Sequence, residues 1–400
     1  MGGAGMAETF DAIVVGAGVI GASTAFHLAK LGGLKVCVVE RGPVCSGGTA
    51  KSCAIVRSHY SVPTNTQLTV KSVEMFGQFQ DWLEDNDAES GFTNSGYIIV
   101  APEGEFADTL ANNLAMQAGV GADTFEISKE EALERHPLLS VEDAQVIGYE
   151  PESGYADPYL TTTSFLNAAR RKGAMVKTEC AATSLVLDGG KVTGVETAKG
   201  TLHADIVVVA IGPWSRLLTS GIGLDIPLEV SRHTVLTLRS GEAYGRTLPI
   251  VKDLATDNKM YFRPATGGVV LAGTGDHGDP VTSADTMDEN VGDDFILYLG
   301  ELVAHRMPSF AQAQLTDSWV GAYDITPDWN PVLGFVPGIG GLMLNFGFSG
   351  HGFKLAPSIG KVQAQTALGL ATDVDISGYG LDRFETGRLL TGAYGIGSIS

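Results

Sequence analysis

The sequence predicts an α/β fold of two domains, with a parallel βαβ unit at the start of the chain and short strands later. Its 400 residues are too many for one compact core. Apolar residues make up 44% of the chain and charged residues 18%, which is enough to bury large cores. The stretch from Phe10 to Val39 runs from an apolar segment through a glycine-rich turn and a helical pattern to a second apolar segment.

The first strand is predicted over Phe10 to Val15, and a glycine-rich turn, GAGVIG, follows it at once. In such a turn Gly16 permits the tight bend, Gly18 lets the backbone approach a pyrophosphate, and Gly21 lets the helix pack closely on the strand. A helix predicted from Ile20 to Leu31 would direct its N–H groups and partial positive charge at the phosphates.

The second strand, Lys35 to Val39, ends in Glu40. A carboxylate at this place can accept hydrogen bonds from ribose hydroxyls. Strand, turn, helix, second strand and acid are all in order, so the sequence predicts a dinucleotide site here. The motif alone does not distinguish FAD from NAD.

Two later segments favour a flavin. The segment from Ser46 to Tyr60 is too long, and too rich in small polar residues, for the next β-α step of an NAD dehydrogenase. A loop of small residues can instead run along an extended ligand. The stretch from Asn345 to Lys354 is a second glycine-rich strand-to-helix turn, whose N–H groups could hold negative charge, and a helix is predicted from Ala356 to Leu370.

Four motifs in sequence order define the chain more specifically. They are VVGAGVIGASTAFHLA with Glu40, the loop GGTAKSCAIVRSHYS, the pair formed by Glu152 to Pro158 and Ala204 to Trp214, and Thr326-Pro327-Asp328 leading to GFSGHGFK. Together they resemble the D-amino-acid-oxidase superfamily of FAD enzymes, in the branch of monomeric sarcosine oxidase, glycine oxidase and the β subunit of heterotetrameric sarcosine oxidase. The resemblance spans Phe10 to Phe384.

This resemblance implies the domain organisation. A Rossmann-like FAD-binding domain of the glutathione-reductase type would be interleaved with a substrate domain built on an antiparallel sheet. The first would comprise residues 8–92, 150–225 and 315–390, and the second residues 93–149 and 226–314. Short strand-like stretches at 235–238, 260–263 and 269–273 agree with this division.

The resemblance also implies a set of FAD contacts. Val176 would lie on the adenine side, and the turn at Gly350 would face the flavin pyrimidine edge. No cysteine occurs in Trp319 to Asp324, where monomeric sarcosine oxidase tethers its flavin, so FAD is expected to be noncovalent. The expected cofactor residues are Gly16, Gly18, Val19, Ile20, Gly21, Glu40, Arg41, Gly48, Thr49, Ala50, Ser52, Val176, Ala210, Gly212, Trp214, Gly350, His351, Gly352, Phe353 and Lys354.

Arg57 and Lys354 match the carboxylate-binding arginine and lysine of sarcosine oxidase, and are expected to clamp an anionic substrate. Tyr261 and Arg263 alternate onto one face of a predicted strand, so Arg263 is a second candidate carboxylate partner. His351 could contribute to the flavin site or pack away from it. His59 could line the pocket or simply pack.

The expected reaction is hydride transfer to flavin N5 from the carbon next to nitrogen in a small carboxylated amine, which gives an imine that water hydrolyses. Sarcosine, glycine, other N-methyl or D-amino acids and proline-like imino acids all fit one carboxylate clamp. Three alternatives remain: a 2-hydroxy-acid enzyme with His59 or His351 as base, a noncatalytic flavoprotein subunit, and an NAD dehydrogenase.

Charge and composition limit the partners. A net charge of −20 repels phosphate backbones and anionic lipid, so nucleic-acid and membrane partners are not expected. The four cysteines lack metal-site spacing, and we expect a cytoplasmic protein without a metal. Val270 is aligned with the oxygen-activating lysine of monomeric sarcosine oxidase, so the acceptor could be oxygen, a quinone or a partner protein. A homo-oligomer or a β subunit in a hetero-oligomer both remain open.

Overall fold

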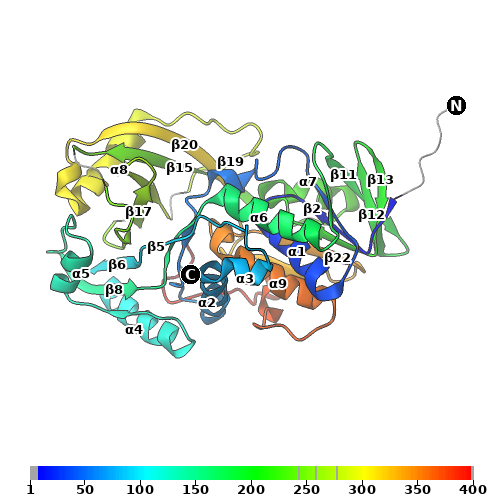
Figure 1. Ribbon diagram of the computed structural model, residues 1–400, viewed down its shortest axis with the longest axis horizontal. Coiled ribbons are helices and arrows are strands. Elements are labelled where there is room, and N and C mark those ends of the chain that lie inside the picture. The colour runs from blue at the N-terminus through cyan, green and yellow to red at the C-terminus, as the bar shows by residue number, and fades with distance from the viewer. Residues whose placement is uncertain (1–7, 242–243, 257–258, 276–277, 398–400) are drawn as a thin grey trace.

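The computed structural model describes residues 8–241, 244–256, 259–275 and 278–397. Two large sheets, one of six and one of nine strands, form its framework. Figure 1 shows them in two parts side by side along the long axis, one around α1, β2 and β22 and the other around β15, β20 and β6. This combination of a parallel α/β part and a largely antiparallel part confirms the predicted fold class.

The six-stranded sheet is parallel except at one edge. Its β2 and β3 are fully buried, because layers cover both faces of the sheet. In sheet order its strands are β10 (Met175–Lys177), β3 (Val36–Val39), β2 (Ala12–Val15), β14 (Ile206–Val209), β22 (Leu342–Phe346) and the antiparallel β21 (Val332–Phe335).

Helices cover one face of this sheet and a smaller sheet covers the other. Helix α1 (Val19–Gly32) packs between α6 (Pro158–Arg171) and α9 (Gly352–Ala367), and its alanines allow close approach to both. The four strands on the other face are β1 (Glu8–Thr9), β13 (Gly200–His203), β12 (Lys191–Thr197) and β11 (Ala182–Asp188).

The nine-stranded sheet is antiparallel except where β16 and β6 run parallel. Helices α8 (Asp293–Arg306) and α5 (Lys129–Arg135) pack on one face, and α4 (Glu105–Gly119) on the other. Its strands are β19 (Pro280–Val281), β15 (Glu229–Arg239), β18 (Val269–Thr274), β17 (Met260–Ala265), β16 (Ile250–Asp253), β6 (Tyr97–Pro102), β8 (Ala144–Glu150), β7 (Phe125–Glu126) and β20 (Gln314–Ile325), which pairs with β15.

The remaining elements are a small sheet, four helices and five 3-10 turns within the described residues. A small sheet contains β4 (Ile55–Val56), β9 (Gly154–Tyr155) and β5 (Thr93–Asn94). The other helices are α2 (Pro63–Gly77), α3 (Phe79–Leu83), α7 (Ser215–Thr219) and α10 (Arg383–Thr386), with 3-10 turns η1 (Gly48–Lys51), η2 (Gly212–Trp214), η3 (Ser220–Ile222), η4 (Pro308–Phe310) and η5 (Ser377–Tyr379). Among the described residues, no helix is both long and apolar enough to cross a membrane.

We propose the interleaved two-domain division with the boundaries given above. The six-stranded sheet draws its strands from three separate stretches of chain, and the nine-stranded sheet from the stretches between them. One strand crosses the division, because β20 begins at the proposed boundary near residue 315 yet pairs along its length with β15. β20 therefore connects the two parts, and its C-terminal end reaches the site described next.

Candidate active site

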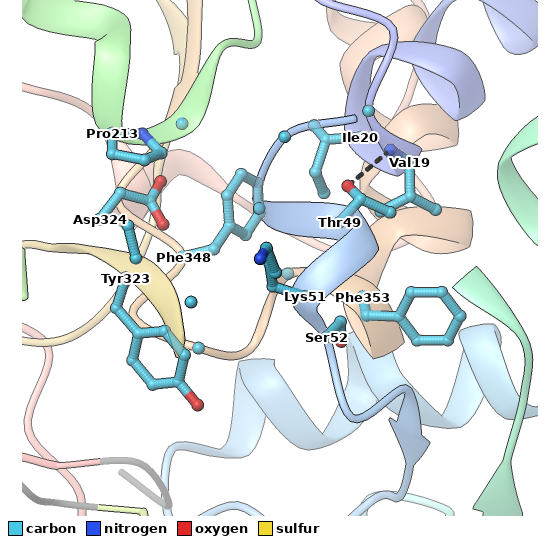
Figure 2. Close-up of a pocket in the computed structure, with 18 of the residues that line it drawn as sticks. Val19, Ile20, Thr49, Lys51, Ser52, Pro213, Tyr323, Asp324, Phe348 and Phe353 are labelled. Atoms are coloured by element: carbon cyan, nitrogen blue, oxygen red, sulfur yellow. Dashed lines mark hydrogen bonds between the residues drawn. The ribbon is translucent and has the colours of Figure 1, made fainter. Parts of the chain in front are cut away.

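One cavity is lined from both large sheets. The α/β part contributes Val15, Glu40 and Ala210, and the nine-stranded sheet contributes Val235 and Tyr261. Figure 2 shows residues of its wall, with Pro213, Asp324 and Tyr323 on one side and Val19, Ile20 and Thr49 across from them.

Backbone approaches closely at the end of the cavity next to α1. Gly16 has a φ of +108°, and a Cβ there would lie 2.3 Å from the carbonyl oxygen of Ala210. A Cβ on Gly18 would lie 3.0 Å from Oγ1 of Thr49, which accepts a hydrogen bond of 3.1 Å from the Val19 N–H (Figure 2). A side chain at either glycine would therefore disturb the turn.

The start of α1 has the features of a phosphate site. Its N-cap residue, Gly18, makes no side-chain capping bond, and the first turn carries no acid. Glu40 lies on the cavity wall and is held by the N–H groups of Ala17, at 2.8 Å, and Gly42, at 3.0 Å. These residues fit a dinucleotide whose phosphates lie at the helix start and whose ribose lies at the carboxylate.

A second helix start also faces the cavity. Gly350 has a φ of +82°, and a Cβ there would lie 2.3 Å from the Tyr323 ring. Helix α9 starts at Gly352, with His351 at its N-cap, no side-chain capping bond and no acid in its first turn. The helix begins four residues before the predicted Ala356, so Lys354 lies in its first turn. The positive end of α9 suits the electron-rich edge of a flavin.

A buried carboxylate also lies on the cavity wall. Asp324, near the end of β20, lines the cavity and accepts a hydrogen bond of 2.7 Å from the Gly347 N–H. Burial raises the pKa of its carboxyl to about 6. Beside it Tyr323 stacks on His233 with ring centroids 3.6 Å apart, and both rings line the cavity.

Arg57 and Lys354 lie on the same cavity wall, although they are far apart in sequence. Their exposed fractions are 5% and 7%. Arg57 follows β4, donates a hydrogen bond to the carbonyl of His59 and lies 4.4 Å from the centroid of the Tyr60 ring. Burial holds the pKa of Lys354 well below its ordinary value, and the nearby charge of Arg57 lowers it further. The cavity thus has a cationic region beside the start of α9, in which Arg57 is charged and the charge of Lys354 depends on pH.

Tyr261 lies in the same region, and its hydroxyl is 3.0 Å from the sulfur of Cys53. Burial is the main reason that the pKa of Tyr261 is well above its ordinary value. Opposite Tyr261 in the β16–β17 pair is Lys252, which also lines the cavity. The sequence reasoning missed Lys252, although a single lysine after the apolar Ile250 and Val251 was a signal that could have been followed.

Two of the residues predicted for substrate binding or catalysis, Arg263 and His59, are not on the cavity wall. The Nε of Arg263 donates to the carbonyl of Cys53 at 2.6 Å, and its guanidinium lies 4.6 Å from the Tyr155 ring centroid. Arg263 does follow the alternation with Tyr261, but its Nε and Nη1 donate to the carbonyls of Cys53 and Pro264 and it does not line the cavity, so it is not placed as a substrate partner. The ring of His59 contacts Gln117 and Tyr394, both at 3.1 Å, and burial lowers its pKa to about 3.

Most of the predicted cofactor residues do line the cavity, and Gly21, Ala50 and Val176 do not. A Cβ on Gly21 would lie 2.0 Å from the Gly16 carbonyl oxygen, so its place is in helix-to-strand packing. Val176 packs against the core beside β3. The predicted residues on the wall are Gly16, Gly18, Val19, Ile20, Glu40, Arg41, Gly48, Thr49, Ser52, Ala210, Gly212, Trp214, Gly350, His351, Gly352, Phe353 and Lys354.

The two stretches compared above with monomeric sarcosine oxidase, around Val270 and from Trp319 to Asp324, can also be located. Val270 packs into the core on the far side of β18, and its neighbour Leu271 packs with Tyr261 on the side nearer the site. Gly321 lines the cavity in the stretch that lacks a cysteine. Among the four cysteines, all within the described residues, Cys53 is the one on the wall. No group of three or more potential metal ligands occurs in the described part of the chain.

Comparisons with known proteins agree with this geometry. The sarcosine oxidase subunit beta of Arthrobacter sp. is 27% identical over 390 residues, covering 96% of this chain and 93% of its own. The L-proline dehydrogenase of P. horikoshii superposes with a TM-score of 0.88 at 26% identity, covering 96% of this chain and 100% of its own.

Glycine oxidase from Geobacillus kaustophilus is similar in both sequence and structure. It is 26% identical over 383 residues, covering 94% of this chain and 98% of its own. Its crystal structure superposes with a TM-score of 0.81, covering 94% of this chain and 99% of the other. The family model described as FAD dependent oxidoreductase matches residues 11–366, and the chain is therefore a member of this family of FAD-dependent oxidoreductases that act on amino acids and amines.

Proposed function

We propose that this protein oxidises a small primary or secondary amine that carries a carboxylate, such as sarcosine or another N-methyl or simple amino acid. A hydride leaves the carbon next to nitrogen, the amine becomes an imine, and water hydrolyses the imine to an amine and a carbonyl compound. Bound FAD supplies the redox chemistry by accepting the hydride. The protein's part is to bind the substrate, orient its C–H bond and exclude water.

The observation that carries this proposal is the cationic region at the start of α9. Arg57 and Lys354 are both buried, both line the cavity, and interact electrostatically. In a chain of net charge −20, two such cations favour a small anion bound there. Arg57 would give a carboxylate a bidentate partner and Lys354 a second, point-like charge. The relatives named as sarcosine oxidase, glycine oxidase and proline dehydrogenase support an amino-acid substrate.

The 2-hydroxy-acid alternative has less support. That reaction needs a base that removes a hydroxyl proton. His59 does not line the cavity, and its ring is hydrogen-bonded to Gln117 and Tyr394. His351 lines the cavity and stays the candidate base for that reaction. An amine that binds in its neutral form needs no such base.

We further propose that FAD is bound noncovalently, that oxygen or another compound accepts the electrons, and that the protein is cytoplasmic. The name of the Arthrobacter relative, a subunit of sarcosine oxidase, also supports a role as a subunit of a larger assembly.

The test is anaerobic mixing of the FAD-loaded protein with carboxylated amines and with 2-hydroxy acids, followed by admission of air. We expect carboxylated amines to bleach the flavin. Bleaching by hydroxy acids alone would refute the proposal, and the rate of colour return would identify or exclude oxygen as the acceptor.

A further inference from the structure

The cavity wall carries a third buried cation that the proposed reaction does not use. Lys252 in β16 is 3% exposed and lines the same cavity as Arg57 and Lys354. A simple amino acid brings one carboxylate, for which Arg57 and Lys354 suffice. The carboxylate of a simple amino acid therefore does not explain why Lys252 lines the cavity.

Strand geometry determines which way Lys252 points. Val251 packs into the core beneath the nine-stranded sheet, so Lys252 projects from the opposite face. Asp253 returns to the core side, where its carboxylate accepts a hydrogen bond of 2.9 Å from Arg306 Nε. The sequence neighbour of Lys252 is thus engaged with Arg306, while Lys252 itself faces the cavity.

Lys252 lies beside the groups proposed to bind substrate. Its Nζ is 5.7 Å from the ring centroid of Tyr261, whose hydroxyl contacts Cys53. One of its N–H groups donates to the Lys259 carbonyl at 2.6 Å, which fixes the ammonium at this place. The positive charge of Lys252 also contributes to the lowered pKa of Lys354. All these groups therefore belong to one electrostatic environment.

The acids on the described wall lie elsewhere. Glu40 is at the α1 end, bound to backbone N–H groups, and Asp324 accepts the Gly347 N–H, with Gly212 next to it. Arg57, Lys252 and Lys354 bring three buried basic side chains to the same wall, and a desolvated ammonium among them interacts strongly with an anion.

We propose that Lys252 is a specificity-determining residue that binds a second acidic group of the substrate, so that amino dicarboxylates are preferred over amino acids with one carboxylate. This inference rests on the proposed amine oxidation. Arg57 and Lys354 would hold the carboxylate next to the reacting carbon, and Lys252 would hold the distal one. An ammonium at this position binds a distal carboxylate through a charge-assisted hydrogen bond.

The experiment uses matched substrates that differ by one carboxylate. N-methylalanine is compared with N-methylaspartate, and N-methyl-2-aminobutyrate with N-methylglutamate, each in both configurations, by anaerobic stopped-flow reduction of the bound flavin. The proteins are the unaltered enzyme, Lys252→Met, Lys252→Arg and, as a control, Lys129→Met. Lys129, in α5, donates a hydrogen bond to the Glu142 carbonyl at the surface, so its substitution removes one charge away from the cavity.

We expect the unaltered enzyme and the Lys129→Met control to prefer a dicarboxylate. Lys252→Met should lose about 10- to 100-fold in reduction rate over dissociation constant for that dicarboxylate, the size expected for one hydrogen bond to a charged group. N-methylalanine should change by less than about threefold, and Lys252→Arg should keep part of the preference. Lys252→Met should fold, because it removes a desolvated charge, and flavin content and thermal midpoint report this directly.

Three results would overturn the inference: a preference for N-methylalanine in the unaltered enzyme, equal losses on both substrate types in Lys252→Met, or a defect confined to reoxidation by oxygen. The last would assign Lys252 to the acceptor half-reaction. If no amine in the panel bleaches the flavin, the proposed function itself fails, which is distinguishable from all three.

Discussion

Arg41 and Asp285 form an ion pair, with Nη2 and Oδ1 2.9 Å apart, that ties the segment after β19 to the turn after β3. Trp214 donates its indole N–H to the same carboxylate at 2.9 Å, and the Arg41 guanidinium lies 4.3 Å from the Trp214 ring. Lys51 and Glu289 make a second tie at 3.3 Å. Since Arg41, Trp214 and Lys51 line the cavity, these contacts tie residues 285–289, here called the strap, to its wall.

Replacing Asp285 with alanine should loosen this strap and speed the release of FAD. The ion pair is exposed, so the expected increase in dissociation rate is small, about two- to fivefold at low salt and less at high salt. The measurement is flavin fluorescence after dilution. Asp382→Ala removes a comparable exposed pair with Arg388 and serves as the control. An unchanged release rate in Asp285→Ala would show that the strap does not retain FAD.

Gly350→Ala should impair FAD binding. Its Cβ would lie 2.3 Å from the Tyr323 ring, and its φ of +82° is unfavourable for alanine, so the turn before α9 must shift. We expect purified protein with a clearly reduced flavin content. Gly369→Ala is the matched control, since Gly369 also has a positive φ, +65°, but no atom lies near its added Cβ. That variant should lose stability of about 1 kcal/mol or somewhat more and keep its FAD. Equal flavin loss in both would count against a specific role for the Gly350 turn.

Lys354 should make the binding of anions pH-dependent. Burial holds its pKa well below the ordinary lysine value, and a carboxylate binds best when Lys354 is protonated. The affinity for propionate, which has no titrating amine, should therefore fall as pH rises through this lowered pKa. Lys354→Arg should flatten the profile, because arginine stays charged. Flavin spectral titration measures both, and identical profiles would contradict the assignment.

Acid should destabilise the protein through its buried histidines. The pKa values of His27 and His59 are lowered from 6.5 to about 3, and that of His136 to about 4, mainly by burial. The folded state then binds fewer protons than the unfolded state, so stability is lost as pH falls from 6.5 towards 3. The thermal midpoint should decline over this window, and His27→Leu should make the decline shallower. A slope unaffected by that change would contradict this account for His27.

Residues 10–40 were predictable in detail, because each glycine of the turn has a local geometric requirement. Gly16, Gly18 and Glu40 lie where the motif predicts them, within a strand, turn and helix that are all local in sequence. The start of α9 was less predictable, since nothing in the sequence marks Gly352, rather than Ala356, as its first residue.

The substrate end depended on tertiary contacts that a sequence pattern does not contain. Strand alternation placed Tyr261 and Arg263 on one face, but only the fold reveals that Arg263 donates a hydrogen bond to the Cys53 carbonyl. His59 is buried by Gln117 and by Tyr394 from the distant end of the chain. Lys252 was overlooked because its strand joins the sheet by pairing with both β6 and β17.

The most direct test of the central claim is a comparison of carboxylated and carboxylate-free substrates in Arg57→Met and Lys354→Met. For the unaltered protein and each variant, anaerobic flavin reduction is measured with sarcosine, or the best amine found, and with its analogue lacking the carboxylate. If Arg57 and Lys354 clamp the carboxylate, each variant should lose about 10²-fold with the acid and almost nothing with the analogue. Equal losses on both compounds, or none on either, would contradict the claim.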